Sequence, residues 1–236
     1  LAGKDVHDST SLDAEVPAYE KLFTDGLKGL KVGLPKGFLD GLNADIKEKV
    51  DAAAKRLQEL GAELVEVEVP HAKYAAPCYY IITSAEASSN LGRFDGIRYG
   101  YADKQAQDLN AYYEGSRKPF GLEVKKRIII GTYALTSGRY EECFVKAMKV
   151  RELIRDDFKK AFEKVDILLT PTSPTTAFKL GAHDEDPLAL YLAELAGISV
   201  PFGKDKNGLP IGVQFYGPIL QEEKILNAAY NLEKGV

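Results

Sequence analysis

A strand–helix–strand pattern near the start of the chain restricts its possible folds more than any other feature. A short apolar strand is expected at residues 30–34. Apolar residues at helical spacing then follow Asn43, a favourable N-cap, and end before Gly61, a favourable C-terminal stop. Residues 62–69 alternate apolar and polar side chains, as a half-buried strand does. Short connections between these elements predict a parallel, right-handed crossover unit.

The middle of the chain is predominantly helical. The sequence predicts helices over residues 73–91, 107–115, 122–136 and 139–164, with a loop at 93–105. The last helix has the clearest pattern, because one apolar stripe lies opposite its charged residues. That stripe consists of Tyr140, Phe144, Ala147, Val150, Ile154, Phe158, Ala161 and Val165. Residues 73–164 are therefore expected to form a helical layer inserted between elements of a sheet.

The pattern of a sheet returns after this layer. Strands are expected at 166–170, 197–201 and 210–216, and an amphipathic helix at 222–233. Two prolines make the TPTSPTT segment between residues 170 and 176 a rigid loop. The hairpin connection at 202–209 contains Asn207-Gly208, a favoured turn. The residues alone thus predict an α/β protein with an inserted helical layer.

Composition narrows the class of protein. Of the 236 residues, 45% are hydrophobic and 28% charged, which is typical of a globular chain. The net charge of −4 does not favour a general binder of polyanions. The longest mainly apolar run, residues 74–85, is too short to cross a bilayer, so no membrane association is expected. Cys78 and Cys143 are isolated from one another and fit a reducing compartment and core packing.

Motifs of common enzyme classes are absent from the sequence. It contains no GxGxxG, GxxxxGKS, HExxH or GxSxG motif, so a standard phosphate loop is not expected. His183 begins an HDEDP run, which a solvated loop explains better than a metal cluster. His71 and His7 are interpreted as structural residues. No metal site is predicted.

A polar break interrupts the helix expected at 73–91. The SAEASSN segment places Glu86, Ser89 and Asn90 on one helical face. Two interpretations remain open: a buried polar network that binds backbone groups, which the residues favour, and a wall that faces a substrate.

Three consecutive cations, Lys125, Lys126 and Arg127, precede an apolar run. A solvated face is the simpler interpretation from composition. However, Val124 and Ile128 flank Arg127 on the buried side of the expected helix, so this arginine could turn inward. An inward guanidinium needs a partner, and its planar fork suits a carboxylate.

Several sequence blocks resemble the C-terminal half of the amidase signature family and, more narrowly, the glutaminase subunits of the tRNA-dependent amidotransferases. The blocks are KDVHDSTS at 4–11, GLKVGLPKGF at 29–38, PHAKYAAPCYYIITSAEASSNLGRFDGIRYG at 70–100, FGLEVKKRIIIGTYALTSG at 120–138, KVRELIRDDFKKAFEKVDILLTPTSPTTAF at 149–178 and GISVPFGKDKNGLPIGVQFYGP at 197–218. The resemblance implies a mixed central β-sheet flanked by helices, with residues 1–236 forming the C-terminal portion of one amidase domain.

The resemblance also implies a chemistry. In the family, a Ser–cis-Ser–Lys triad hydrolyses glutamine, and the ammonia passes to a partner subunit. The triad belongs to a Gly/Ser-rich signature in the N-terminal half, and no GGSSGG-like stretch occurs here. No catalytic residue is therefore assigned to this chain, which is expected to be inactive alone. The first residue is Leu1 and the only methionine is Met148, so the start is expected to be processed or preceded by more chain.

The resemblance assigns part of the family's glutamine pocket to positions of this sequence. The resemblance places the binding tyrosine at Tyr79 and the arginine that grips the α-carboxylate at Arg127. The family's third pocket residue, an aspartate, should lie between Tyr191 and Leu192, where this sequence is about ten residues short of the family pattern. Either a true deletion or an omitted disordered loop would explain this, and we favour the loop. Glu194 lies nearby but is not assigned that role.

Partners and location also follow from the resemblance. It implies a heterotrimer with two further subunits, ATP and Mg²⁺ used by the partner subunit, misacylated tRNA contacted mainly through that partner, and a cytoplasmic location. No cofactor is expected in this chain itself. Two alternatives remain: a stand-alone amidase acting on another amide, and a non-catalytic interaction or scaffold fragment.

Overall fold

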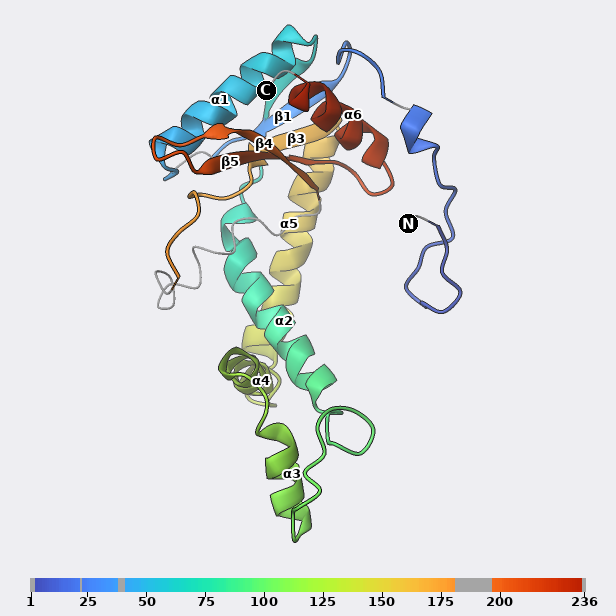
Figure 1. Ribbon diagram of the computed structural model, residues 1–236, viewed down its shortest axis with the longest axis vertical. Helices are drawn as coiled ribbons and strands as arrows, with labels where there is room; N and C mark the ends of the chain where they lie inside the picture. The colour runs from blue at the N-terminus through green and yellow to red at the C-terminus, as the bar shows by residue number, and fades with distance from the viewer. Residues whose placement is uncertain (1–2, 22, 38–40, 181–196, 235–236) are drawn as a thin grey trace. The chain divides into compact units, whose positions relative to one another are not determined.

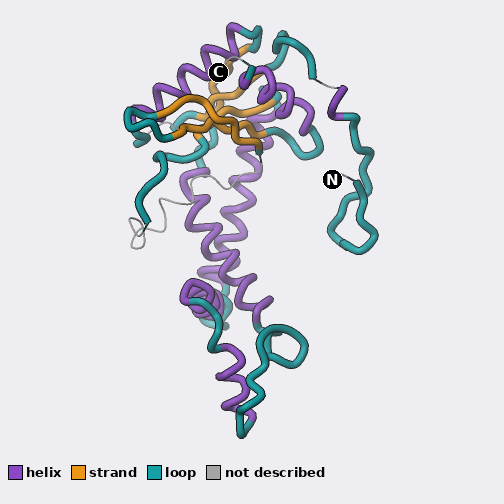
Figure 2. Tube along the Cα trace, viewed as in Figure 1, coloured by secondary structure: helices purple, strands orange, loops and turns teal. Residues whose placement is uncertain are grey.

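A computed structural model describes residues 3–21, 23–37, 41–180 and 197–234. The chain divides into two compact units. Unit 1 joins Leu1–Val69 to Phe158–Val236, and unit 2 is Pro70–Asp157. Every strand of the described chain belongs to unit 1, whereas unit 2 consists of helices and loops (Figure 2). The helical layer expected near residues 73–164 overlaps unit 2 but extends beyond its end at Asp157.

Unit 1 is built on a five-stranded mixed sheet (Figure 1). The order is β2-β1-β3-β5-β4, where β1 pairs in parallel with β2 and β3, and β5 pairs antiparallel with β3 and β4. The strands are β1 (Lys31–Pro35), β2 (Glu63–Val67), β3 (Ile167–Pro171), β4 (Ile198–Lys204) and β5 (Pro210–Tyr216). Because α1 connects the parallel pair β1 and β2, the predicted parallel strand–helix–strand unit is confirmed.

Two helices, α1 (Ala44–Glu59) and α6 (Glu222–Glu233), pack on the same face of the sheet (Figure 1). The predicted N-cap is confirmed, since Asn43 Oδ1 accepts a hydrogen bond from the Asp45 main-chain N–H at 3.0 Å. The apolar stripes of both helices join the inward side chains of the strands in one core. Its fully buried members include Val32, Val50, Leu57, Ile167, Leu169, Val213, Phe215 and Leu232.

The connection between β4 and β5 differs from the prediction. The sequence analysis ended the strand at residue 201, but β4 continues to Lys204 with an irregular register after Pro201. Gly203 makes this possible because its φ of +90° suits a residue without a side chain. The remaining turn is organised by Asp205, whose Oδ1 accepts hydrogen bonds from the N–H groups of Asn207 and Leu209, each at 2.8 Å.

The helices of the middle region form where the periodicity predicts them, with changes at their ends. They are α2 (Ala75–Leu91), α3 (Leu109–Arg117), α4 (Leu122–Ala134) and α5 (Lys146–Phe162), and a short 3₁₀ turn, η2 (Ala72–Tyr74), precedes α2. Another 3₁₀ turn, η1 (Tyr19–Lys21), lies before β1. The helix expected at 107–115 begins two residues later because Asp108 caps it, accepting from the Ala111 N–H at 2.8 Å. The helix expected from residue 139 opens as a π turn, η3 (Glu141–Val145).

No helix in the described ranges is long and apolar enough to span a membrane.

The crossing of α2 and α4 is the closest contact in unit 2. In Figure 1, α4 is seen nearly end-on where it meets α2. A Cβ added to Gly131 of α4 would overlap the main-chain carbonyl oxygen of Ser84 on α2. Ser84 and Ala134 are almost completely buried beside this point. The absence of a side chain at Gly131 therefore allows the two backbones to touch.

Candidate functional site

Arg127 turns partly inward, as its flanking residues suggested. Its side chain is 24% exposed, whereas Lys125 and Lys126 are exposed residues. Val124 and Ile128, one on each side of these positions, are half-buried. The α-helical period explains the contrast, because residues at 124, 127 and 128 lie on one side of α4.

Glu123 and Tyr80 both contact the Arg127 guanidinium. Arg127 Nε donates a hydrogen bond to Glu123 Oε1 at 3.1 Å, one helical turn earlier on α4. The guanidinium carbon lies 5.8 Å from the centre of the Tyr80 ring on α2, within the range of a cation–π contact. A carboxylate therefore accepts a hydrogen bond from one edge of the group, and the group lies over an aromatic ring of the neighbouring helix.

The structure brings the helices that carry Tyr79 and Arg127 into direct contact. Tyr79 is half-buried, and its carbonyl oxygen accepts a hydrogen bond from Thr83 Oγ1 at 2.8 Å. Successive helical residues point about 100° apart, so Tyr79 and Tyr80 occupy different faces of α2. The sequence analysis missed Tyr80 and Glu123. The four-residue spacing of Glu123 and Arg127 was a usable signal, but nothing in the sequence indicated Tyr80.

The polar break in α2 does not form the buried network that the residues favoured. Glu86, Ser89 and Asn90 are all exposed. Ser84 is the fully buried member of the segment, and its Oγ has no hydrogen-bond partner in the described part of the chain. The prediction was wrong because α4 packs on the side of α2 that carries Ser84, not on the side that carries Glu86.

His71 contacts the buried side chain of Asp157 and makes no side-chain capping hydrogen bond to η2. Asp157 is buried, and its Oδ2 accepts a hydrogen bond from the His71 main-chain N–H at 2.8 Å and lies 3.0 Å from the His71 ring Nδ1. This contact joins the start of unit 2 to its end. His7 is exposed. The residues His183, Tyr191, Leu192 and Glu194 lie outside the described residues.

Cys78 occupies the core of unit 2, as expected. Its Sγ donates a hydrogen bond to the carbonyl oxygen of Ala147 at 3.1 Å. Burial raises the pKa of the Cys78 thiol, which disfavours the reactive thiolate. Cys143 is half-buried, and both cysteines are free.

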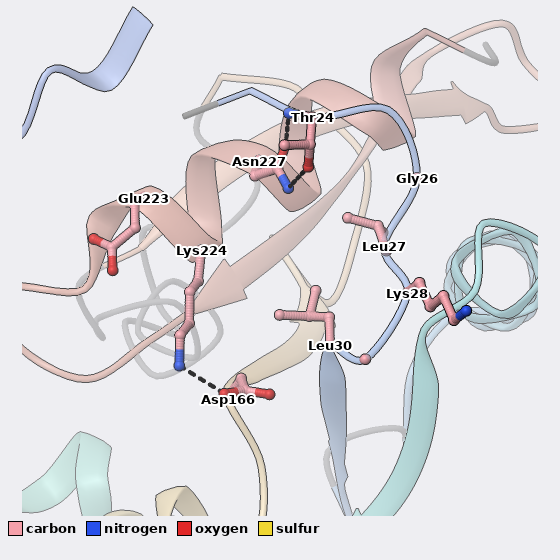
Figure 3. Close-up of a pocket in the computed structure, with 10 residues that line it drawn as sticks. Thr24, Gly26, Leu27, Lys28, Leu30, Asp166, Glu223, Lys224 and Asn227 are labelled. Atoms are coloured by element: carbon pink, nitrogen blue, oxygen red, sulfur yellow. Dashed lines mark hydrogen bonds and ion pairs between the residues drawn. The ribbon is translucent and has the colours of Figure 1, made fainter. Parts of the chain in front are cut away.

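A pocket of about 330 Å³ lies in unit 1, between the segment before β1 and helix α6. Figure 3 shows contacts between Lys224 and Asp166 and between Thr24 and Asn227 across this pocket. Lys224 Nζ contacts Asp166 Oδ1 at 2.6 Å, and Thr24 and Asn227 exchange two hydrogen bonds. Burial opposes ionisation of Asp166, but hydrogen bonds from Lys224 and the Lys31 N–H keep the pKa of this carboxyl below its usual value. These groups stabilise the fold, and we assign the pocket no chemistry.

A polar strip crosses the sheet face opposite α1 and α6. Leu169 and Val213 face the helices, so the alternating neighbours Thr170 and Gln214, which pair across β3 and β5, face the other way. In the part of the chain that the structure describes, Thr170 Oγ1 and Gln214 Oε1 are buried without hydrogen-bond partners. A buried polar atom without a hydrogen bond costs free energy. The hydrogen bonding of this polar strip is therefore incomplete within the described residues.

The chain is similar in sequence to proteins of one known family. The sequence profile of the amidase family matches residues 1–226. The chain is 49% identical over 247 aligned positions to the A subunit of glutamyl-tRNA(Gln) amidotransferase of Prochlorococcus marinus (strain MIT 9211), covering 99% of this chain and 51% of that protein. The protein of the same name from Geotalea daltonii is 48% identical over 99% of the chain. The chain thus spans about half the length of the curated relatives it matches.

Solved structures agree with the sequence relatives. The A subunit of glutamyl-tRNA(Gln) amidotransferase from Thermotoga maritima superposes with a TM-score of 0.72 at 36% identity, covering 98% of this chain and 48% of that one. A bacterial aryl acylamidase of the amidase signature family has the same fold, with a TM-score of 0.72 at 19% identity.

Proposed function

The chain belongs to the amidase family, and on this premise we propose that it is part of a glutaminase that supplies ammonia for tRNA-dependent amidation. Relatives that carry the name of this amidotransferase, 48–49% identical along nearly the whole chain, support the proposal. The observation that carries it is the half-buried Arg127, held by Glu123 and Tyr80. A planar guanidinium in such a place suits a ligand with a carboxylate, and glutamine has one on its α-carbon.

In this proposal, Arg127 binds the α-carboxylate of glutamine, and Tyr79 forms part of the pocket wall. The exposed Lys125 and Lys126 add positive potential that attracts the anionic end of the substrate. Holding that end orients the side-chain amide for attack. We assign the nucleophile and its base to the half of the relatives' length that this chain does not span, and no catalytic residue to the chain itself.

The proposal extends to the assembly. Ammonia released from glutamine would pass to a partner subunit, which activates the tRNA-bound carboxylate with ATP and Mg²⁺. We place the protein in a cytoplasmic heterotrimer in which that partner makes most contacts with misacylated tRNA. This chain would hold neither ATP nor metal.

Replacement of the arginine tests the proposed function. In the full-length gene product assembled with its partner subunits, Arg127→Ala should lower kcat/KM for glutamine hydrolysis by about 10- to 100-fold, as expected for loss of a charge-assisted hydrogen bond. Arg139→Ala is the matched control. Arg139 also contacts a glutamate, Glu142 at 2.8 Å, and a tyrosine ring, Tyr133 at 5.8 Å, but its side chain is 51% exposed.

The same assay separates the alternatives. If Arg127→Ala and Arg139→Ala both retain wild-type activity, the substrate has no carboxylate to bind, and a stand-alone amidase acting on another amide becomes the better interpretation. If the full-length protein hydrolyses no glutamine with its partners present, the scaffold interpretation replaces the proposal.

A further inference from the structure

We infer that Glu123 and Tyr80 are positioning residues for Arg127: together they set the orientation in which its guanidinium receives a carboxylate. The inference rests on the proposed function and deepens it. Neither residue needs to touch the substrate. Both act by restricting how the guanidinium can rotate and tilt.

A guanidinium is a flat group at the end of a long, flexible side chain. Its orientation is fixed only when it can neither rotate within its own plane nor tilt out of that plane. The hydrogen bond from Arg127 Nε to Glu123 Oε1 (3.1 Å) restrains the edge that carries Nε. The guanidinium carbon lies over the Tyr80 ring, 5.8 Å from its centre, and this contact holds the group toward α2. A carboxylate ligand then meets the guanidinium in a restricted orientation.

Two features distinguish this cluster from a surface ion pair. First, Tyr80 belongs to α2 and Arg127 to α4, so their contact depends on the tertiary crossing. Second, each lies one helical turn before the point where Gly131 meets Ser84, so the tightest part of that crossing supports the site. The ion pair of Glu123 and Arg127, at 57% and 24% exposure, would by itself contribute little to stability.

Because Glu123 is negatively charged, its two possible roles predict opposite changes in glutamine binding when it is removed. A carboxylate beside Arg127 opposes the approach of a second carboxylate by simple repulsion. If Glu123 only competed with the substrate, its removal would strengthen glutamine binding. If Glu123 positions Arg127, its removal weakens binding even though the repulsion is gone. Glu123 also lies in the first turn of α4, where a negative charge stabilises a helix, so a purely structural role must be tested separately.

The test uses Glu123→Ala and Glu123→Gln in the full-length gene product with its partner subunits. Glu123→Ala should raise KM for glutamine at least about fivefold with a smaller change in kcat, because an arginine that is no longer oriented loses part of a charge-assisted contact. Glu123→Gln should recover most of that loss, because its amide oxygen can still accept from Nε. Glu142→Ala, which removes the equivalent partner of the exposed Arg139, should leave KM unchanged. An unchanged or lowered KM in Glu123→Ala overturns the inference.

Further variants separate failure of the inference from failure of the proposed function. If Arg127→Ala leaves kcat/KM for glutamine unchanged, the proposed function fails, and the inference fails with it. If Arg127→Ala lowers kcat/KM but Glu123→Ala does not raise KM, only the inference fails. Tyr80→Leu should raise KM, and Tyr80→Phe, which keeps the ring, should recover it. Thermal unfolding of all variants tests whether Glu123 has a purely structural role. Such a role would lower Tm equally in Glu123→Ala and Glu123→Gln and leave KM unchanged.

Discussion

At the scale of single residues, Asp166 connects three parts of unit 1. It lies just before β3, its Oδ1 contacts Lys224 of α6 at 2.6 Å, and its Oδ2 accepts the Lys31 N–H of β1 at 2.9 Å. Both carboxylate oxygens are therefore used, and the half-buried setting limits screening by solvent. This single side chain joins a strand and a helix to the centre of the sheet.

Asp166→Asn should lower the free energy of unfolding at pH 7 by about 1 kcal/mol, because it weakens one partly buried ion pair and one charged hydrogen bond. The pKa of Asp166 is lower in the folded chain than in the unfolded chain. Its contribution is therefore fully present above about pH 4, the usual carboxyl pKa, and is lost as the pH falls through the lower folded value. Urea unfolding at pH 7 and at pH 3 measures the difference, which should shrink at pH 3.

Asp25→Asn is the control for this experiment. Asp25 also pairs with a lysine of the C-terminal region, Lys234, at 2.8 Å, but its side chain is 90% exposed. Its replacement should leave unfolding unchanged within error. Equal effects of the two substitutions would show that Asp166 acts as an ordinary surface charge.

At the scale of elements, the crossing of α2 and α4 controls both stability and the proposed site. Gly131→Ala would force a methyl group into the carbonyl of Ser84, so the helices must separate. We expect a loss of about 1–3 kcal/mol in the stability of unit 2, as for other overpacked contacts. Arg127 should also move away from Tyr80, so KM for glutamine should rise. Denaturant unfolding and glutaminase assays of the full-length protein measure the two effects.

Gly138→Ala provides the matched control, because a Cβ at Gly138 meets no atom within 4 Å. It should change neither stability nor KM by more than experimental error. If Gly131→Ala behaved in the same way, the backbone contact between α2 and α4 would not limit their approach.

At the scale of the whole molecule, the chain is expected to be catalytically inactive by itself. Its 236 residues contain no GGSSGG-like segment, which carries the nucleophile in the family it resembles. The isolated chain should therefore release no ammonia from glutamine, and calorimetry should detect weak binding or none, since part of the pocket is missing. A homologous amidotransferase that carries this segment, assayed with all its subunits, serves as the positive control. Glutamine-dependent ammonia release by the isolated chain at a comparable rate would contradict this prediction.

The sequence by itself determined the type and order of the helices and strands and the buried side of α4, whereas composition favoured a solvated face for Arg127. Ile46, Val50 and Leu57 recur at a period that only a helix can bury on one side, and α1 forms there. Val124 and Ile128 likewise indicated the buried side of α4. These predictions succeeded because helical and strand periods are local properties of the backbone.

Only the tertiary structure decided what surrounds Arg127. Tyr80 and Arg127 are 47 positions apart, and Gly131 and Ser84 are equally distant in sequence. Their contacts depend on where α2 and α4 cross and on how each helix is rotated there. A rotation of one residue, about 100°, would exchange Tyr79 for Tyr80, so local periodicity could not choose between them. The backbone contact that Gly131 permits sets that crossing, and its partner could not be identified before the helices were assembled.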